Sequence, residues 1–274
     1  MSKKTLFNIS FNGLISTLFF LQPLAAQNKY SENDIYKIND IVYKLVAYQR
    51  MDTSPLRLDV YRNNKVVKEK LPTIILIHGG GFWEGDKRSD LYVKMATAFA
   101  LHGYVAISIN YRLKDKTFSY TKSILDTCIV DVMDAMEWVY SNSSQYGIDT
   151  SNIIICGDSA GAGIAVNTSY DPAHAKYFRA CIDLWGGLPD STTWDAPIFK
   201  NGITKYTPPT CIIHGTSDNI IPYKTSRQLS RKLKAAGIYN ELHPLRKADH
   251  YPVQLVNYFV ALMIAFSDKI LKRI

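Results

Sequence analysis

The sequence predicts an α/β fold: one doubly wound domain on a mostly parallel sheet, with an antiparallel hairpin at its N-terminal edge. Short, continuously apolar runs typical of buried parallel strands alternate along the chain with segments of helical length. Two longer strand-like segments separated by a turn precede them. The 274 residues are 47% hydrophobic and 20% charged, which suits one globular domain and excludes a largely disordered chain.

The predicted elements follow in order. Residues 41–48 and 56–61 form the hairpin, with a turn around 52–55. The parallel strands are expected at 73–77, 105–109, 153–156, 181–184 and 211–214, and the helices at 90–102, 123–141, 160–168, 224–236 and 252–271. Strand, helix, strand repeated in this way implies right-handed crossovers. We expect neither a second domain nor a large lid.

The first 26 residues have the pattern of a secretory signal peptide. Lys3 and Lys4 precede an apolar run at 14–21, and small residues end the segment at Ala26. Polar residues between 8 and 13 shorten the apolar run below what a bilayer of about 30 Å requires. We therefore expect cleavage near Ala26, a mature domain at 27–274, a periplasmic or secreted location and no stable membrane insertion. No cysteine precedes Cys128, so a lipid anchor near the cleavage site is not expected.

The net charge and the cysteine content further limit the kind of protein that the chain can be. The formal net charge of +8 falls to +6 once Lys3 and Lys4 are removed, but the basic residues are scattered and accompany no nucleic-acid motif. Nucleic acid is therefore not an expected partner. The four cysteines allow three disulfide connectivities, yet three of them lie in apolar strand-like runs, which favours free thiols in the core (Cys128, Cys156, Cys181, Cys211). No His/Cys cluster predicts a metal site.

A serine lies where a buried strand must turn sharply into a helix. Gly157-Asp158-Ser159-Ala160-Gly161 directly follows the apolar run 152–156. Glycines two residues before and after Ser159 allow the close backbone approach of such a turn, which exposes the serine hydroxyl. The pentapeptide alone is a weak signal. It predicts a nucleophile only together with groups that activate the serine and stabilise the charge it creates.

A glycine-rich loop supplies the second part of this chemistry. The strand 73–77 runs into His78-Gly79-Gly80-Gly81-Phe82, and glycine lets backbone N–H groups approach a developing oxyanion. We expect the oxyanion hole to comprise the N–H groups of Gly80, Gly81 and Ala160. Phe82 and Trp83 adjoin the loop and are expected to line the substrate site, and Trp185 and Trp194 are weaker candidates for the same role.

The base and the acid are expected downstream of the serine. Asp218 follows the strand 211–214, and His250 lies in a loop before the last helix. Asp183, Asp190 and Asp249 are rival acids, but Asp183 lies within a strand and Asp249 directly adjoins the histidine. His78 and His214 belong to loop-shaping motifs at strand ends, where a histidine is more often a hydrogen-bonded structural residue than a base. His102 ends a helix, His174 lies in a connecting loop, and His243 precedes Pro244 in a strand-like run. The predicted triad is therefore Ser159, Asp218 and His250.

Taken together, HGGGF at 78–82, GDSAG at 157–161, HGTSD at 214–218 and DH at 249–250 resemble the α/β-hydrolase superfamily. The set is most similar to small bacterial esterases of the hormone-sensitive-lipase-like type and to feruloyl or acetyl-xylan esterases. The resemblance implies the α/β-hydrolase fold and ester hydrolysis through an acyl-serine, without cofactor or metal. Two features depart from it: Lys114-Asp115-Lys116 replaces a common Ala-Pro-Glu continuation, and the N-terminal segment is short for a helical cap.

The expected function is that of an exported esterase for short acyl or aromatic acyl groups, such as acetyl or feruloyl decorations of polysaccharide. Its partner is then a small-molecule or glycan ester. An arylformamidase-like amide hydrolase is the alternative, because the motifs at 78–83 and 157–162 also resemble those enzymes. A non-catalytic binding module is a third hypothesis, which a complete triad disfavours. The sequence does not specify the oligomeric state.

Overall fold

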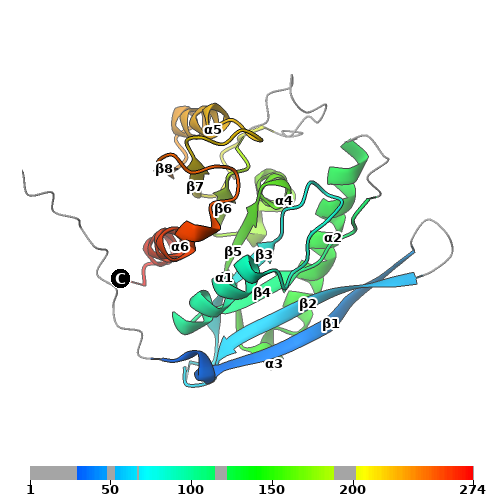
Figure 1. The fold of residues 1–274 in the computed structure, drawn as a ribbon. Coiled ribbons are helices and arrows are strands. Elements are labelled where there is room, and N and C mark those ends of the chain that lie inside the picture. Colours follow the sequence, from blue (N-terminus) through cyan, green and yellow to red (C-terminus); the bar gives the residue numbers. More distant parts are fainter. Residues whose placement is uncertain (1–29, 48–52, 67, 115–121, 188–201, 274) are drawn as a thin grey trace, which may run out of the picture.

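The computed structural model describes residues 30–47, 53–66, 68–114, 122–187 and 202–273. Their centre is one eight-stranded sheet with the order β1-β2-β4-β3-β5-β6-β7-β8 (Figure 1). The strands are β1 Ile35–Ala47, β2 Thr53–Asn63, β3 Leu71–Ile77, β4 Val105–Ile109, β5 Ile148–Asp158, β6 Ala180–Leu184, β7 Thr210–Gly215 and β8 Asn240–Leu245.

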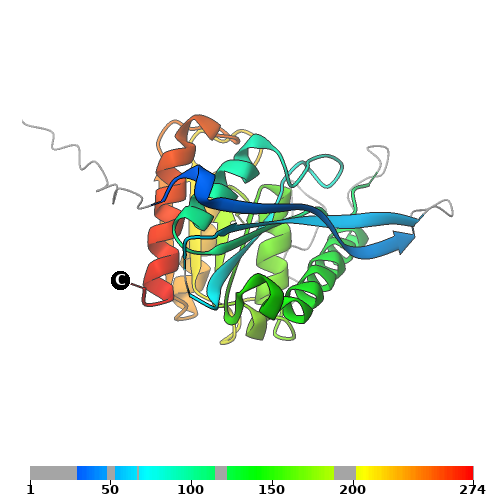
Figure 2. The same cartoon turned by 90° about the horizontal axis from the view of Figure 1, so that it is seen from below.

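The strand directions confirm the predicted fold class. β1 and β2 form an antiparallel hairpin, and β2 also pairs antiparallel with β4. From β4 to β8 every neighbouring pair is parallel. The hairpin strands are longer than predicted and extend beyond the rest of the sheet (Figures 1 and 2). All parallel strands therefore end at one edge, where the carboxyl ends of β3, β5 and β7 deliver the predicted site motifs.

Helices cover both faces of the sheet, as in a doubly wound fold (Figures 1 and 2). α1 (Asp90–Leu101) and α6 (Val256–Ile270) pack on one face, and α2 (Lys122–Ser141), α4 (Ala160–Tyr170) and α5 (Lys224–Ala235) pack on the other. Side chains along a strand alternate between the two cores, so Ile75 and Ile77 join one cluster while Ile74 and Leu76 join the other. Both faces are buried, which explains the continuous apolar runs.

Some elements were predicted less well. β8 had been noted only as a strand-like run, and the short helix α3 (Ser143–Tyr146) and three 3-10 turns, η1 (Glu32–Asp34), η2 (Ala175–Tyr177) and η3 (Val253–Leu255), were not predicted. The expected last helix divides into η3 and α6. The span 253–270 is long and apolar enough to cross a membrane, but α6 buries Phe259, Met263 and Phe266 against the sheet. The core explains its apolarity.

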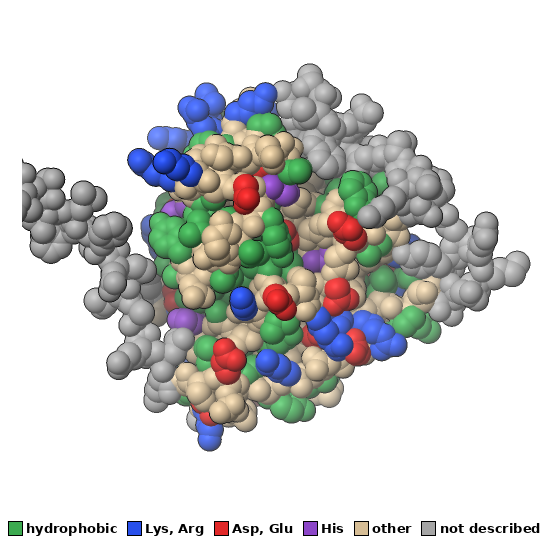
Figure 3. Space-filling view, viewed as in Figure 1, with side chains coloured by type: hydrophobic (Ala, Val, Ile, Leu, Met, Phe, Trp, Pro, Cys, Tyr) green, Lys and Arg blue, Asp and Glu red, His purple; other side chains and the backbone are tan. Residues whose placement is uncertain are grey.

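The four cysteines are free and buried, as predicted. Burial raises the pKa of the Cys181 thiol to about 12, so these thiols behave as apolar core groups. Basic side chains gather over α5 in the space-filling view (Figure 3), where Arg227, Arg231 and Lys232 are exposed. The predicted signal segment 1–26 lies outside the described residues.

Candidate active site

The nucleophile turn has the predicted geometry. Ser159 lies between β5 and α4 with φ 49° and ψ −116°, a left-handed conformation that is strained for a residue with a side chain. Its N–H donates to the carbonyl of Leu184 at 2.9 Å, which holds the turn against β6. A Cβ on Gly157 would collide with the backbone of Gly161, and one on Gly161 with the carbonyl of Ile77. Glycine is therefore required at both positions, because no residue with a Cβ fits there.

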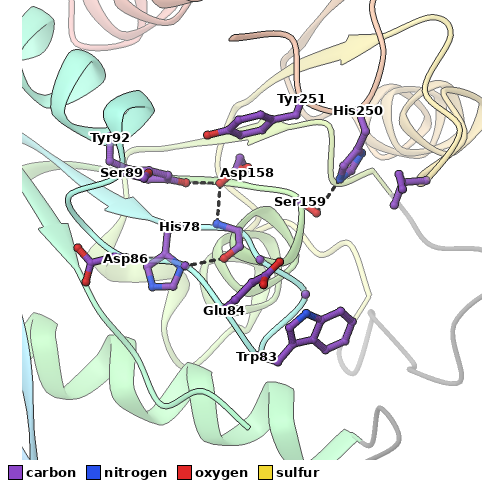
Figure 4. Close-up of a pocket in the computed structure, with 15 residues that line it drawn as sticks. His78, Trp83, Glu84, Asp86, Ser89, Tyr92, Asp158, Ser159, His250 and Tyr251 are labelled. Carbon is purple, nitrogen blue, oxygen red and sulfur yellow. Dashed lines mark hydrogen bonds between the residues drawn. The ribbon is translucent and has the colours of Figure 1, made fainter. Parts of the chain in front are cut away.

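Ser159, His250 and Asp218 form one hydrogen-bonded chain. The Nε2 atom of His250 is 2.9 Å from the Ser159 Oγ (Figure 4). The Nδ1 atom of the same ring is 2.7 Å from the Asp218 Oδ2. Asp218 follows β7, and His250 follows β8 before η3. The structure thus brings together the three residues that the sequence selected, in the arrangement that lets an imidazole accept a serine proton.

The carboxylate of Asp218 is held by four donors. Its Oδ1 accepts the N–H groups of Ile220 at 2.9 Å and Ile221 at 2.8 Å, while its Oδ2 accepts from both His250 and His214. Burial would raise the pKa of Asp218, but the hydrogen bonds from the two histidines outweigh it and hold the pKa well below its usual range. Asp218 therefore remains a carboxylate beside His250.

His214 was predicted to be a hydrogen-bonded structural residue at a strand end, and the structure gives it a particular place. The ring is fully buried; its Nε2 lies 3.0 Å from the Asp218 Oδ2 and its Nδ1 lies 2.6 Å from the Ser226 Oγ. The first contact fixes the carboxylate that orients His250. His214 ends the apolar run 211–214, and no neighbouring residue in the sequence indicates that its ring contacts Asp218.

The rival acids do not take this position. Asp183 is buried in β6 and accepts the backbone N–H groups of Gly186 and Gly187, at 2.8 and 3.0 Å. Burial raises its pKa. The carboxylate that contacts His250 belongs to Asp218, although Asp249 adjoins the histidine in the chain. Asp190 lies outside the described residues.

The glycine-rich loop curves beside Ser159. Gly80 and Gly81 have φ values of 102° and 62°, which residues with a Cβ rarely adopt. The carbonyl of Gly80 accepts the N–H groups of Trp83 and Glu84, both at 3.1 Å, and closes the loop. Ala160 is the first residue of α4, so its N–H has no partner within the helix. The three predicted oxyanion-hole residues thus lie in a tight loop and at a helix N-terminus beside the serine.

Asp158, the residue before the serine, connects this loop to the rest of the site. Its buried carboxylate accepts the N–H of Gly79 at 2.6 Å and the hydroxyl of Tyr92 (Figure 4). It also accepts the indole N–H of Trp185 at 3.2 Å. Burial raises its pKa. No role was predicted for Asp158, because the residues around it in the chain do not indicate which distant donors converge on its carboxylate.

A cavity of about 620 Å³ opens onto the serine. His250, Gly80, Gly81 and Trp83 line it together with Ser159, and Tyr251 closes one side (Figure 4). Trp83 is 40% exposed, so the expectation that it lines the site is met. The cavity wall also contains Glu84 and Asp86, with no Lys or Arg among its described lining residues.

Two of the aromatic predictions were wrong. Phe82 has a positive φ of 72°, is 4% exposed, and packs into the core with its side chain. Trp185 is fully buried, and its ring packs against Phe259 at a centroid distance of 5.4 Å. Neither is among the residues that line the cavity. Trp194, also considered for this role, lies outside the described residues.

No group of three or more potential metal ligands occurs within the part of the chain that the structure describes.

Comparison with solved structures identifies the fold. MGS-M1, described as an α/β hydrolase enzyme from a Medee basin deep-sea metagenome library, superposes with a TM-score of 0.70 over 87% of this chain and 99% of its own. The chain has the α/β-hydrolase fold. At 18% sequence identity, the likeness between the two proteins concerns the fold alone.

Sequence comparisons point in the same direction. A family model described as BD-FAE matches residues 58–181 of this chain. The cAMP-regulated D2 protein of Dictyostelium discoideum is 35% identical over 145 residues, 50% of this chain and 26% of that protein. Esterase LipC of Mycobacterium tuberculosis is 24% identical over 65% of this chain and 52% of its own length. The chain thus spans between about a quarter and a half of these relatives.

Proposed function

We propose that this α/β-hydrolase is an exported serine hydrolase that cleaves carboxylic esters through an acyl-serine. The observation that carries the proposal is the chain from Ser159 Oγ through His250 to the Asp218 carboxylate, with contacts of 2.9 and 2.7 Å. Neutral serine is a poor nucleophile, and this arrangement is the one that activates it.

The reaction follows from these contacts. As the Ser159 Oγ attacks the ester carbonyl carbon, His250 Nε2 accepts the hydroxyl proton, and the carbonyl electron pair moves onto oxygen. Asp218 stabilises the imidazolium and remains ionised. Collapse of the tetrahedral intermediate expels the alcohol, which receives the proton from His250. Water then repeats the sequence on the acyl-serine and releases the acid.

The negative charge of the intermediate requires donors that are already in place. We assign them to the N–H groups of Gly80, Gly81 and Ala160. Fixed donors of this kind stabilise the transition state by about 3 to 4 kcal/mol each, because they need no reorganisation. Asp158 supports the assembly by holding the neighbouring N–H of Gly79 at 2.6 Å.

The substrate class is proposed as short acyl or aromatic acyl esters, such as acetyl or feruloyl groups on a small molecule or glycan. The open cavity beside Trp83 supports this assignment, since an aromatic wall suits an aryl acyl group. The match to the BD-FAE model and the likeness to an esterase named LipC agree with ester hydrolysis. The lysines and apolar run within residues 1–26 support export to the periplasm or the medium.

The decisive experiment measures release of p-nitrophenol from p-nitrophenyl acetate by the wild type, Ser159→Ala and the surface control Ser151→Ala. We expect Ser159→Ala to lower kcat by a factor of about 10⁴ or more while the control keeps the wild-type rate. A wild-type rate no greater than that of Ser159→Ala would contradict the ester assignment. An N-formyl arylamine assayed in parallel would then test the arylformamidase-like alternative.

Export is tested separately. The N-terminal sequence of the exported protein shows whether the chain is cleaved near Ala26.

A further inference from the structure

A second cavity lies next to the one that contains Ser159. Its volume is about 540 Å³, and its walls come from the start of α1 and from the segment between β8 and α6. Tyr251 lines both cavities. A ligand that extends past this ring would therefore occupy both cavities at once. Tyr251 directly follows His250, so the passage between the cavities lies beside the catalytic base.

Tyr251 is held in place although it is 47% exposed. Its ring packs edge-on against Trp185, with centroids 6.4 Å apart and an interplanar angle of 87°. Trp185 is itself fixed by its hydrogen bond to Asp158 and by its packing on Phe259. The exposed phenol ring is thus a preorganised aromatic surface beside the catalytic base, which lowers the entropic cost of binding a ring on it.

The polar lining of the second cavity points to the class of ligand. Three exposed polar side chains line it, and none makes a side-chain hydrogen bond or ion pair with the described residues (Asp90, Lys94, Gln254). A carboxylate acceptor, an ammonium donor and an amide are therefore available to a ligand. The opposite charges of Asp90 and Lys94 disfavour a ligand of either sign. A purely apolar ligand would desolvate these groups without compensation. A neutral, polyhydroxylated ring satisfies them, because each hydroxyl both donates and accepts.

We propose that this second cavity binds a neutral sugar unit of the alcohol part of the substrate, next to the sugar that carries the ester. The inference rests on the proposed esterase function and extends it to an oligosaccharide. Tyr251 lies between the two positions and is the surface on which the chain passes from one cavity to the other. Gln254, Asp90 and Lys94 hydrogen-bond the hydroxyl groups of the second unit.

The kinetic test compares two acetyl esters that differ only in length, monoacetylated xylotetraose and methyl 2-O-acetyl-β-xylopyranoside. Each hydrogen bond of ordinary strength changes kcat/KM by about 3- to 10-fold. We expect the wild type to prefer the tetrasaccharide by at least that factor, and Gln254→Ala and Asp90→Ala to lose most of the preference while keeping the wild-type rate on p-nitrophenyl acetate. Gln228→Ala, an exposed glutamine of α5 outside both cavities, is the matched control. Equal kcat/KM values for the two sugar esters in the wild type would overturn the proposal.

A binding measurement separates this inference from the esterase assignment. Unmodified xylotetraose, mannotetraose and cellotetraose are titrated into Ser159→Ala, with and without Gln254→Ala, and followed by calorimetry. Binding of at least one tetrasaccharide that weakens about 3- to 10-fold in the double variant supports the sugar site even if no ester is cleaved. Absence of binding by all three, or binding that Gln254→Ala leaves unchanged, rejects it, whatever the rate on p-nitrophenyl acetate.

Discussion

Three buried aspartates around Ser159 differ in what they do because their hydrogen-bond donors differ. Asp218 accepts from two histidines and remains ionised beside the catalytic base. Asp183 accepts two backbone N–H groups from the turn after β6, and Asp158 accepts from the glycine-rich loop, Tyr92 and Trp185. The same side chain therefore orients a base, fixes a turn or positions a loop, according to the partners that the fold brings to it.

At Asp158, we predict that Asp158→Asn lowers kcat on p-nitrophenyl acetate by about 10- to 100-fold and changes KM by less than about threefold. The amide cannot accept from all three donors, so the loop that carries Gly80 and Gly81 shifts and stabilises the oxyanion less well. Asp149→Asn is the matched control, because Asp149 lies at the start of the same strand and its partners, Ser151 and Asn152, are neighbours in the chain. A kcat equal to that of the wild type, or an equal loss in the control, would contradict this role.

Single residues were predictable where a local motif fixes their place. Ser159, Asp218 and His250 each follow a strand-like run, and the carboxyl ends of parallel strands meet at one edge of the sheet. Phe82 and Trp185 were misjudged because their direction depends on positive φ values and on distant packing partners. Neither property is encoded in the adjoining residues.

At the scale of elements, burial decided which strands were visible in the sequence. β7 is buried throughout, β3 is buried at every position except Pro72, and both appear as continuous apolar runs. β8 is an edge strand that is mostly half-buried and contains Pro244, which an edge position tolerates. Its sequence therefore lacks the apolar run that marks a central strand. The added length of β1, residues 35–40, is mostly exposed, which likewise leaves little apolar pattern in the sequence.

Helix α4 offers a matched pair of glycines. A Cβ on Gly161 would collide with the carbonyl of Ile77 in β3, whereas a Cβ on Gly163 would meet nothing within 4 Å. We predict that Gly163→Ala raises the free energy of unfolding by about 0.5 to 1 kcal/mol, through helix propensity. Gly161→Ala should lower it by about 3 kcal/mol or more, because α4 must move away from the sheet. Urea unfolding of both variants measures this. Equal effects of the two substitutions would show that the helix-to-strand contact does not control the turn.

For the whole molecule, the aspartates predict how stability depends on pH. A carboxyl whose folded-state pKa is lowered, as in Asp218, contributes stability that is present above its unfolded pKa of about 4 and is lost as pH falls through the folded value. The contribution of Asp183 to stability depends on pH in the opposite direction, because burial raises the pKa of its carboxyl. Its contribution is full below about pH 4 and is lost as pH rises through the folded pKa.

Asp218→Asn and Asp183→Asn each remove one titrating carboxyl, so the two variants measure these opposite contributions to stability separately. Between pH 6 and pH 3, the free energy of unfolding of the wild type minus that of Asp218→Asn should decrease as the solution becomes more acidic. The corresponding difference for Asp183→Asn should increase. Neither slope can exceed about 1.4 kcal/mol per pH unit, the limit for one proton. Urea unfolding at several pH values measures both. Differences that stay constant with pH would mean that the two carboxyls titrate alike in the folded and unfolded chains, and the hydrogen bonds of Asp218 would then not favour its ionised form.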